Sequence, residues 1–302
     1  MNKNFKSGFV SIIGRPNAGK STLLNQILER KLVIVTPKAQ TTRNNIKGIY
    51  NNDDSQIVFV DTPGIHTPHH ELGEVMNKMA FSAMEGMDEI IWIVDVTRKI
   101  DDLDKKIADE LKKIKVPVIL ALNKVDLIKN TDDVEKLIQE YKALYDFDGG
   151  ITISAAENHN IQKLINMIID RLPFGYPYYP TDQLLDQPER FCVAEIIREK
   201  VLLLTDEEVP HSVAVTVDSF KPNQKNHNMI DIHATIIVER SSQKKIIIGK
   251  DGQMIKKIGT LARKDIVDFL GNKIYLELFV KVEENWRNKK SQLNEYGYRL
   301  DK

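Results

Sequence analysis

Short apolar runs alternate with amphipathic stretches along the first half of the chain. The runs lie at 9–13, 57–60, 90–94, 116–120 and 151–153. Continuous apolar runs separated by helical stretches are typical of a parallel sheet that is buried on both faces. The pattern therefore predicts an α/β domain with a mostly parallel sheet and helices on both faces, and ligands are expected at the carboxyl ends of its strands.

The pattern changes after residue 171. The segment 172–180 contains three prolines, which preclude a continuing helix. Beyond it, the residues predict, in order, a helix, two strands, a helical region and a strand, at 194–203, 212–220, 230–239, 253–270 and 273–282. We expect a first domain at 1–173, a linker at 174–190 and a smaller α+β domain at 191–302.

Composition narrows the class of protein. The 302 residues contain 43 basic and 43 acidic side chains, so any attraction to nucleic acid or membrane must be local. The single cysteine, Cys192, excludes an internal disulfide and is expected to be a buried structural thiol. No apolar run approaches the roughly 18 residues that a membrane span needs, and the N-terminus lacks a signal-peptide pattern, so we expect a cytoplasmic protein.

The turn after the first apolar run has the spacing of a phosphate-binding loop. Glycines there let successive backbone N–H groups and a helix N-terminus face one polyphosphate. Lys20 is expected to reach the β- and γ-phosphates, and Ser21 a Mg²⁺ ion. The predicted nucleotide contacts in this segment are Gly14, Arg15, Pro16, Asn17, Ala18, Gly19, Lys20, Ser21 and Thr22.

Three further motifs follow strand ends; the first is expected to contact Mg²⁺ and the γ-phosphate, and the other two the guanine base. After 57–60 come Asp61, Thr62, Pro63 and Gly64, of which Asp61 is expected to hold Mg²⁺ through water and the Gly64 N–H to meet a γ-phosphate. After the fourth run comes Asn123-Lys124-Val125-Asp126, in which the Asp126 carboxylate matches the N1–H and N2 donors of guanine that adenine lacks. Asn123 is expected to fix the neighbouring loop and Lys124 to cover the base. After 151–153 come Ser154, Ala155 and Ala156, small residues that let a backbone N–H approach the guanine O6.

The polar segment 38–43 is expected to be a mobile loop that senses the γ-phosphate. A threonine there would ligate Mg²⁺ only in the triphosphate state. Thr42 is the preferred ligand and Thr41 the alternative. Lys20, Thr42, Asp61 and Gly64 are thus the expected catalytic residues.

Hydrolysis is expected to be slow. In Ras-like enzymes a Gln after the glycine orients the attacking water, whereas this chain has Ile65. Asn17 offers an oxygen through which a K⁺ ion could supply the missing charge. Two other clusters are not expected to bind metal ions. His66, His69 and His70 are expected to lie in a solvated loop, and residues 101–104 to form the acidic first turn of a helix.

The second domain contains a loop that suits RNA. Residues 246–252 are expected to join a strand to a helix, with Gly249, Lys250, Asp251 and Gly252 forming the Gly-x-x-Gly turn by which KH domains hold single strands. Between Arg240 and Lys264 there are eight basic residues against one acid, and Lys256 and Lys257 follow the loop on its helix while Ile255 and Ile258 face the core.

Taken together, these motifs resemble the Era family of bacterial GTPases over nearly the whole chain. The matching segments are 14–22, 38–43, 61–64, 123–126, 195–200 and 248–252. The resemblance implies a P-loop GTPase domain followed by a type II KH domain, with GTP or GDP and Mg²⁺ as ligands. It also implies binding to the 3′ end of 16S ribosomal RNA during 30S assembly and peripheral association with the cytoplasmic membrane. We expect a monomer.

Two other functions stay open at this point. One is a nucleotide-locked RNA-binding module with negligible turnover, for which Ile65 is the argument. The other is a GTPase that acts in tRNA modification or on a membrane partner, with the C-terminal domain as a protein-docking surface.

Overall fold

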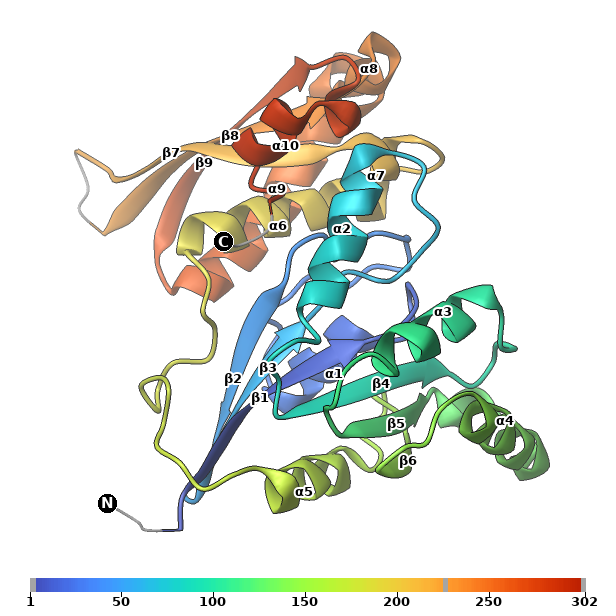
Figure 1. Cartoon of the computed structure of the whole chain (residues 1–302). Coiled ribbons are helices and arrows are strands. Elements are labelled where there is room, and N and C mark those ends of the chain that lie inside the picture. Colours follow the sequence, from blue (N-terminus) through green and yellow to red (C-terminus); the bar gives the residue numbers. More distant parts are fainter. Residues whose placement is uncertain (1–3, 225–227, 300–302) are drawn as a thin grey trace. The chain divides into compact units, whose positions relative to one another are not determined.

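The computed structural model describes residues 4–224 and 228–299 and divides into two compact units. The first unit comprises Met1–Val33, Thr42–His69 and Gly73–Asp186. The second comprises Ile34–Thr41, His70–Leu72 and Gln187–Lys302 (Figure 1). The division after Asp186 falls inside the segment 174–190 that the sequence marks as a linker, and α6 already begins at Glu189.

The first unit is built on a six-stranded sheet in the order β2-β3-β1-β4-β5-β6. Its parallel strands are β1 (Lys6–Ile13), β3 (Ser55–Asp61), β4 (Glu89–Asp95), β5 (Val118–Asn123) and β6 (Gly149–Ile153). They match the five predicted apolar runs, so the predicted parallel sheet is confirmed. The edge strand β2 (Ile46–Asn51), which runs antiparallel to β3, was not predicted.

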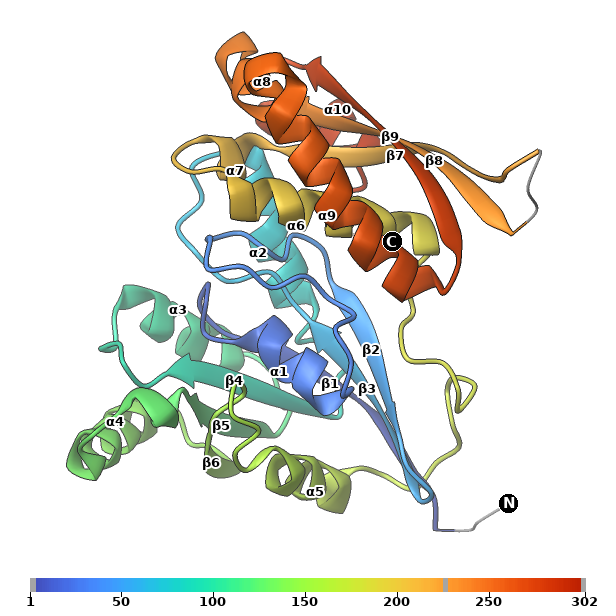
Figure 2. The ribbon, with the colours of Figure 1, turned by 180° about the vertical axis from the view of Figure 1, so that it is seen from behind.

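Helices cover both faces of this sheet. On one face, α1 (Lys20–Ile27) contacts α5 (Ile161–Arg171). The other face carries α3 (Asp102–Leu111) and α4 (Thr131–Leu144), as Figure 2 shows. Alternate side chains of β4 and β5, such as Trp92 and Leu120, pack in the core beneath α3 and α4, together with residues of α2 (Glu71–Ser82).

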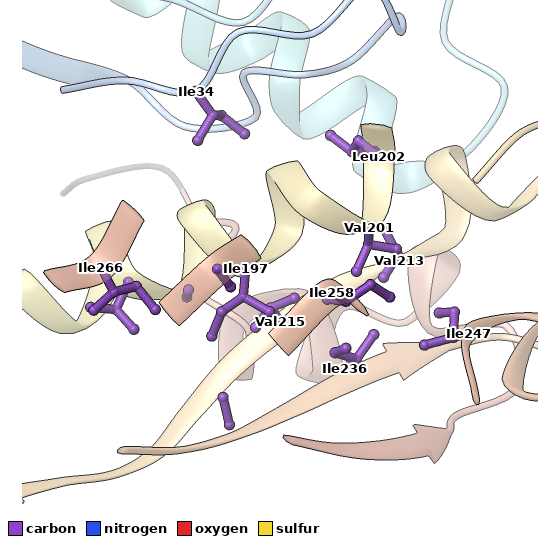
Figure 3. Close-up of a cluster of buried hydrophobic side chains, with 14 of the residues drawn as sticks. Ile34, Ile197, Val201, Leu202, Val213, Val215, Ile236, Ile247, Ile258 and Ile266 are labelled. Atoms are coloured by element: carbon purple, nitrogen blue, oxygen red, sulfur yellow. The ribbon is translucent and has the colours of Figure 1, made fainter. Parts of the chain in front are cut away.

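The second unit is an α+β domain with a three-stranded sheet. The strands β7 (Ala214–Pro222) and β8 (Met229–Val238) are antiparallel, and β9 (Lys273–Val282) joins β8 in parallel. The long helices α6 (Glu189–Leu204) and α9 (Gln253–Leu270) pack on this sheet and on each other. Figure 3 shows their core, in which Val201 and Ile258 lie near Ile236. The short elements of this unit are α7 (Val209–Ser212), α8 (Ser241–Ile248), η2 (Lys250–Gly252), η3 (Trp286–Asn288) and α10 (Lys290–Glu295).

One predicted element is wrong. The isoleucine run at 246–248, expected to be a strand, is the last turn of the helix α8. β-branched residues favour strands, but local capping overrides this preference here. The Gln243 side chain accepts hydrogen bonds from the backbone N–H groups of Glu239 (2.9 Å) and Arg240 (3.0 Å), which starts the helix. The glycine loop therefore joins two helices, and Ile247 enters the core.

Candidate functional site

The segment between β1 and α1 forms a tight loop that only glycine permits at two positions. Gly14 and Gly19 have φ angles of 152° and 105°. A Cβ on Gly14 would lie 2.3 Å from the Ile93 carbonyl oxygen, and one on Gly19 would lie 2.2 Å from Nδ2 of Asn123. The loop therefore packs against the ends of two neighbouring strands, β4 and β5, and opens onto the N-terminus of α1 at Lys20.

The Lys20 side chain is buried inside this loop. Its Nζ donates to the carbonyl oxygens of Gly14 (3.2 Å) and Arg15 (2.9 Å). Burial lowers the pKa of Lys20 to about 8, although the nearby Asp61 carboxylate opposes the shift. An ammonium group that is already desolvated interacts strongly with phosphate oxygens.

Three predicted metal ligands from different segments converge. Ser21 Oγ lies 2.8 Å from Thr42 Oγ1 and donates to Asp61 Oδ2 at 2.7 Å. Burial raises the pKa of Asp61 to about 6, and its Oδ1 has no hydrogen-bond partner in the described part of the chain. Two hydroxyls and an unsatisfied buried carboxylate form an oxygen-only donor set that fits Mg²⁺.

The structure separates the two threonine candidates. Thr42 faces Ser21, as just described, whereas Thr41 Oγ1 lies 2.7 Å from Thr36 Oγ1 and donates to the Lys38 carbonyl at 2.7 Å. The geometry favours Thr42 as the ligand.

The loop after β3 lies against the phosphate loop. A Cβ on Gly64 would lie 2.7 Å from the Cα of Pro16, so a larger residue would push the two loops apart. The N–H of Ile65 donates to the Gly14 carbonyl at 3.1 Å, and its side chain is fully buried in the core. Ile65 therefore fixes the loop and offers no group to orient water.

His66 differs from its expected solvated setting. The residue is half-buried, with its ring Nδ1 2.8 Å from the Gly64 carbonyl oxygen. Burial lowers the pKa of this imidazole, which favours the neutral form.

The end of β5 joins the two halves of the nucleotide site. The Asn123 Nδ2 donates to the Ala18 carbonyl at 2.8 Å, and its Oδ1 accepts from the Ala155 N–H at 2.9 Å. Asn123 and Ala155 are buried, whereas Asp126 and Ala156 are exposed. One amide thus holds together the phosphate loop and the loop after β6.

A residue that sequence reasoning did not weigh completes this side of the site. Asp95, the last residue of β4, accepts a hydrogen bond from Lys124 Nζ at 2.6 Å. Burial alone would raise the pKa of Asp95, but hydrogen bonds from Lys124 and Thr97 outweigh it and lower the pKa. Its position directly after the apolar run 90–94 is the same signal that marks the other motifs.

The remaining predicted positions lie where their motifs place them. Thr62 donates through Oγ1 to the Ile12 carbonyl at 2.7 Å. Pro63 and Ser154 are buried, while Asn17 and Thr22 are half-buried. Cys192 is buried, as expected, and burial raises the pKa of its thiol to about 12.

In the second unit, the Gly-x-x-Gly turn has a backbone that needs glycine. Gly249 and Gly252 both have φ of 73°, and Asp251 has φ of 51°. A Cβ on Gly249 would lie 2.7 Å from the Cβ of Met254. Lys250 is exposed, so the turn presents a cation and accessible backbone to solvent.

A groove of about 650 Å³ runs between α9 and β9. Three basic and two acidic side chains are among the residues that line it, which are Ile255, Lys256, Gly259, Thr260, Arg263, Lys264, Val267, Asp268, Leu276, Glu277 and Leu278. Of the residues expected to bind RNA, only Lys256 is among the lining residues of this groove, whereas Lys257 and the turn residues 249–252 are not. Ile255 also lines it and does not enter the core as predicted. Arg263 and Lys264 also line the groove and were not among the predicted RNA contacts, although their helical spacing from Lys256 is visible in the sequence.

No helix in the described ranges is both long and apolar enough to cross a membrane.

Comparison with known proteins identifies the two domains. Residues 9–124 match the family model described as 50S ribosome-binding GTPase, and residues 208–287 match that of the KH domain. One similar solved structure is a variant of Aquifex aeolicus Era bound to GDP and AlF₄⁻, with 41% identity and a TM-score of 0.94. Another is Era in complex with MgGDPNP and nucleotides 1506–1542 of 16S ribosomal RNA, with 41% identity and a TM-score of 0.95.

Both matches cover 98% of this chain and 100% of the other chain. The similarity therefore extends across the phosphate loop, the guanine motifs and the glycine turn between α8 and α9. This chain belongs to the Era family of GTPases.

Proposed function

We propose that this chain binds GTP, hydrolyses it slowly, and binds the 3′ end of 16S ribosomal RNA through its KH domain during assembly of the small (30S) ribosomal subunit. The observation that carries the proposal is the presence on one chain of a converged phosphate and metal site and of a groove lined by Lys256, Arg263 and Lys264 on the helix that follows a Gly-x-x-Gly turn. An Era that is 41% identical was solved with 16S RNA.

The residues of the first unit suit the transfer of a γ-phosphoryl group to water. Ser21, Thr42 and Asp61 would hold Mg²⁺, which supplies positive charge to the phosphates when bound. Lys20, whose Nζ donates to the Arg15 carbonyl at 2.9 Å, would donate to the phosphate oxygens that gain charge in the transition state. No side chain acts as a covalent nucleophile.

We further propose that K⁺ assists the reaction at Asn17. The buried Ile65 leaves the site without a Gln to orient water, and Asn17, with φ of 63°, lies at the outer turn of the phosphate loop. Turnover is expected to fall when Na⁺ replaces K⁺ at equal ionic strength. The Asn17→Ala variant should lose this difference between the two cations, and equal rates for the unmodified protein would refute the idea.

The RNA proposal is tested by measuring affinity for an oligonucleotide that carries the 3′ end of 16S RNA, with GTP analogue or GDP bound. Selective binding over a scrambled oligonucleotide of the same length is expected. Crosslinking in cells followed by sequencing provides a second test, in which recovery of tRNA instead of 16S RNA would favour a role in tRNA modification. GTP turnover that is absent even with saturating RNA would favour the nucleotide-locked module.

We also propose peripheral association with the cytoplasmic membrane, supported by the resemblance of the motifs to the Era family. Co-sedimentation with vesicles of anionic and of neutral lipids tests it. Binding to neither would refute the proposal.

A further inference from the structure

The side chain of Arg15 points from the phosphate loop to the start of α3. Its NH2 group lies 2.8 Å from Oδ2 of Asp101, and its NH1 group lies 3.0 Å from Oδ2 of Asp104. NH1 also donates to the carbonyl oxygen of Lys99 at 3.2 Å. All three acceptors belong to the turn before α3 or to its first turn, so the guanidinium group is committed to this helix.

Asp104, the partner of Arg15 on α3, is buried and hydrogen-bonded, unlike the carboxylate of a surface ion pair. The Asp104 side chain is fully buried, and its Oδ2 also accepts the N–H of Asp101 at 3.0 Å in a capping box. Burial raises the pKa of Asp104, while the charge of Arg15 and the hydrogen bond from Asp101 oppose the shift. A buried carboxylate is costly without a cation, so Arg15 and Asp104 depend on each other.

The backbone of Arg15 belongs to the phosphate loop itself. Its carbonyl oxygen accepts hydrogen bonds from Lys20 Nζ at 2.9 Å and from the Ala18 N–H at 3.3 Å. The next residue, Pro16, lies against Gly64, where a Cβ would come within 2.7 Å of the Pro16 Cα. The position of Arg15 therefore controls the outer turn of the loop, from 15 to 18.

We propose that Arg15 and Asp104 form a strap that ties the outer turn of the phosphate loop to α3, and that this strap sets the lifetime of the bound guanine nucleotide. Arg15 is then a positioning residue and neither a phosphate ligand nor an arginine finger. The inference rests on the proposed binding of guanine nucleotide.

The expected effect is on binding more than on chemistry. Without the strap, the outer turn can move. Its N–H groups then point toward the phosphates for only part of the time, which weakens nucleotide binding. Lys20 and Ser21, by contrast, have their backbone in α1, and Lys20 Nζ keeps its hydrogen bond to the Gly14 carbonyl at 3.2 Å. Loss of the strap should accelerate nucleotide release and raise KM for GTP, with little change in kcat.

The test measures release of fluorescently labelled GDP from the full-length protein in stopped flow. Asp104→Asn is expected to raise the dissociation rate at least 10-fold, with kcat at saturating GTP within about 3-fold of the original. The matched control is Asp102→Asn, because Asp102 lies in the same helical turn, is exposed and pairs with Lys105. The control should leave both values unchanged.

Two further variants distinguish a strap from other roles. Arg15→Ala should raise the dissociation rate as Asp104→Asn does, and the double variant should be no faster than either single variant. Arg15→Lys keeps the positive charge but loses the two-pronged guanidinium group, so its dissociation rate should lie between those of the unmodified protein and Arg15→Ala.

Several outcomes would overturn the strap. One is a dissociation rate for Asp104→Asn equal to that of Asp102→Asn; another is a dissociation rate for Arg15→Ala equal to that of the unmodified protein. If Asp104→Asn fails to fold, Arg15→Ala breaks the same contact from the side of the phosphate loop and carries the test by itself. Failure of the unmodified protein to bind labelled GDP would instead refute the proposed nucleotide site.

Discussion

At the scale of single residues, discrimination between bases is expected to rest on Asp126. Its carboxylate is exposed, and it follows Asn123 and Lys124 at the end of β5. The Asp126→Asn variant keeps the size of the side chain but replaces one acceptor with a donor. We expect affinity for GTP to fall roughly 100-fold, since the N2 amino group of guanine loses its acceptor.

The same change should favour xanthosine triphosphate, whose base has a carbonyl where guanine has the amino group. Competition against a fluorescent nucleotide measures both affinities. Asp133→Asn, an exposed position on α4, is the control and should bind GTP normally. If Asp126→Asn loses affinity for GTP and for xanthosine triphosphate equally, the substitution has damaged the loop and has not changed its base specificity.

How much of the site could be predicted depended on where its partners lie in the sequence. The phosphate loop is contiguous, so its glycine spacing alone predicted the geometry around Lys20. The pairing of Arg15 with Asp104 joins residues 89 positions apart, and no local pattern indicates it. Asp95 is intermediate, because its place after a strand was visible but its pairing with Lys124 was not.

At the scale of elements, β4 begins with a carboxyl group in an unfavourable place. The Glu89 side chain is 1% exposed, and neither oxygen has a hydrogen-bond partner among the described residues. Its nearest cation is Arg171, whose NH1 is 3.5 Å away. Burial raises the pKa of Glu89 to about 8; Arg171 lowers it and Asp148 raises it further.

This raised pKa predicts how folding stability depends on pH. Between the ordinary pKa of 4.5 and about 8, the native protein holds a proton on Glu89 that the unfolded chain has lost. Stability should therefore fall as the pH rises through this window. Glu89→Gln should remove the dependence and make the protein more stable at pH 8 by about 1–3 kcal/mol, with little effect at pH 5.

Urea denaturation of the full chain at both pH values measures the difference in unfolding free energy. Glu85→Gln, at an exposed position after α2, is the control and should follow the original protein. A Glu89→Gln variant that loses stability between pH 5 and 8 as steeply as the original would show that another group is responsible.

The turn between α8 and α9 gives a second prediction at this scale. Gly249→Asp places a side chain where φ is 73° and where Met254 leaves no room, and it adds negative charge beside the expected phosphates. We expect RNA affinity to fall at least 10-fold, while GTP binding stays unchanged. Filter binding and labelled-GDP titration measure the two affinities.

Gly271→Asp is the matched control for this variant. Gly271 ends α9 with φ of 67° and has open space around it, so the substitution carries similar backbone strain outside the loop. Equal losses of RNA binding in both variants would attribute the effect to folding and would count against the loop.

Elements were predicted well where periodicity and burial agree. The α9 helix and β9 strand have the predicted limits because their apolar residues repeat at the helical and strand periods. The α8 helix was missed because three isoleucines favour a strand, whereas the capping side chain of Gln243 acts through a specific contact that composition does not reveal.

At the scale of the whole molecule, balanced charge and nucleic-acid binding are compatible because the cations are concentrated. The chain has 43 basic and 43 acidic residues, yet Lys256, Arg263 and Lys264 line one groove, in which Asp268 and Glu277 are the acidic residues. If these three contact phosphates of single-stranded RNA, affinity should fall roughly 20-fold between 50 and 200 mM salt.

Titrations at several salt concentrations give this slope. Lys256→Ala should reduce its magnitude by about 0.7, the value for one phosphate contact on a single strand, whereas Lys142→Ala on α4 should not. A salt-independent affinity would mean that the groove contacts the bases of the RNA and not its phosphates.

The position of Asn123 has a consequence for ligands smaller than GTP. Its amide bonds simultaneously to Ala18 in the phosphate loop and to Ala155 in the loop expected beside the base. A fragment such as guanosine or pyrophosphate would contact only one of these two loops. Its binding would order that loop directly and the other loop through the Asn123 amide. The two fragments should then bind cooperatively. The affinity of the nucleotide site for GTP would therefore exceed what the separate affinities for the base and for the phosphates predict.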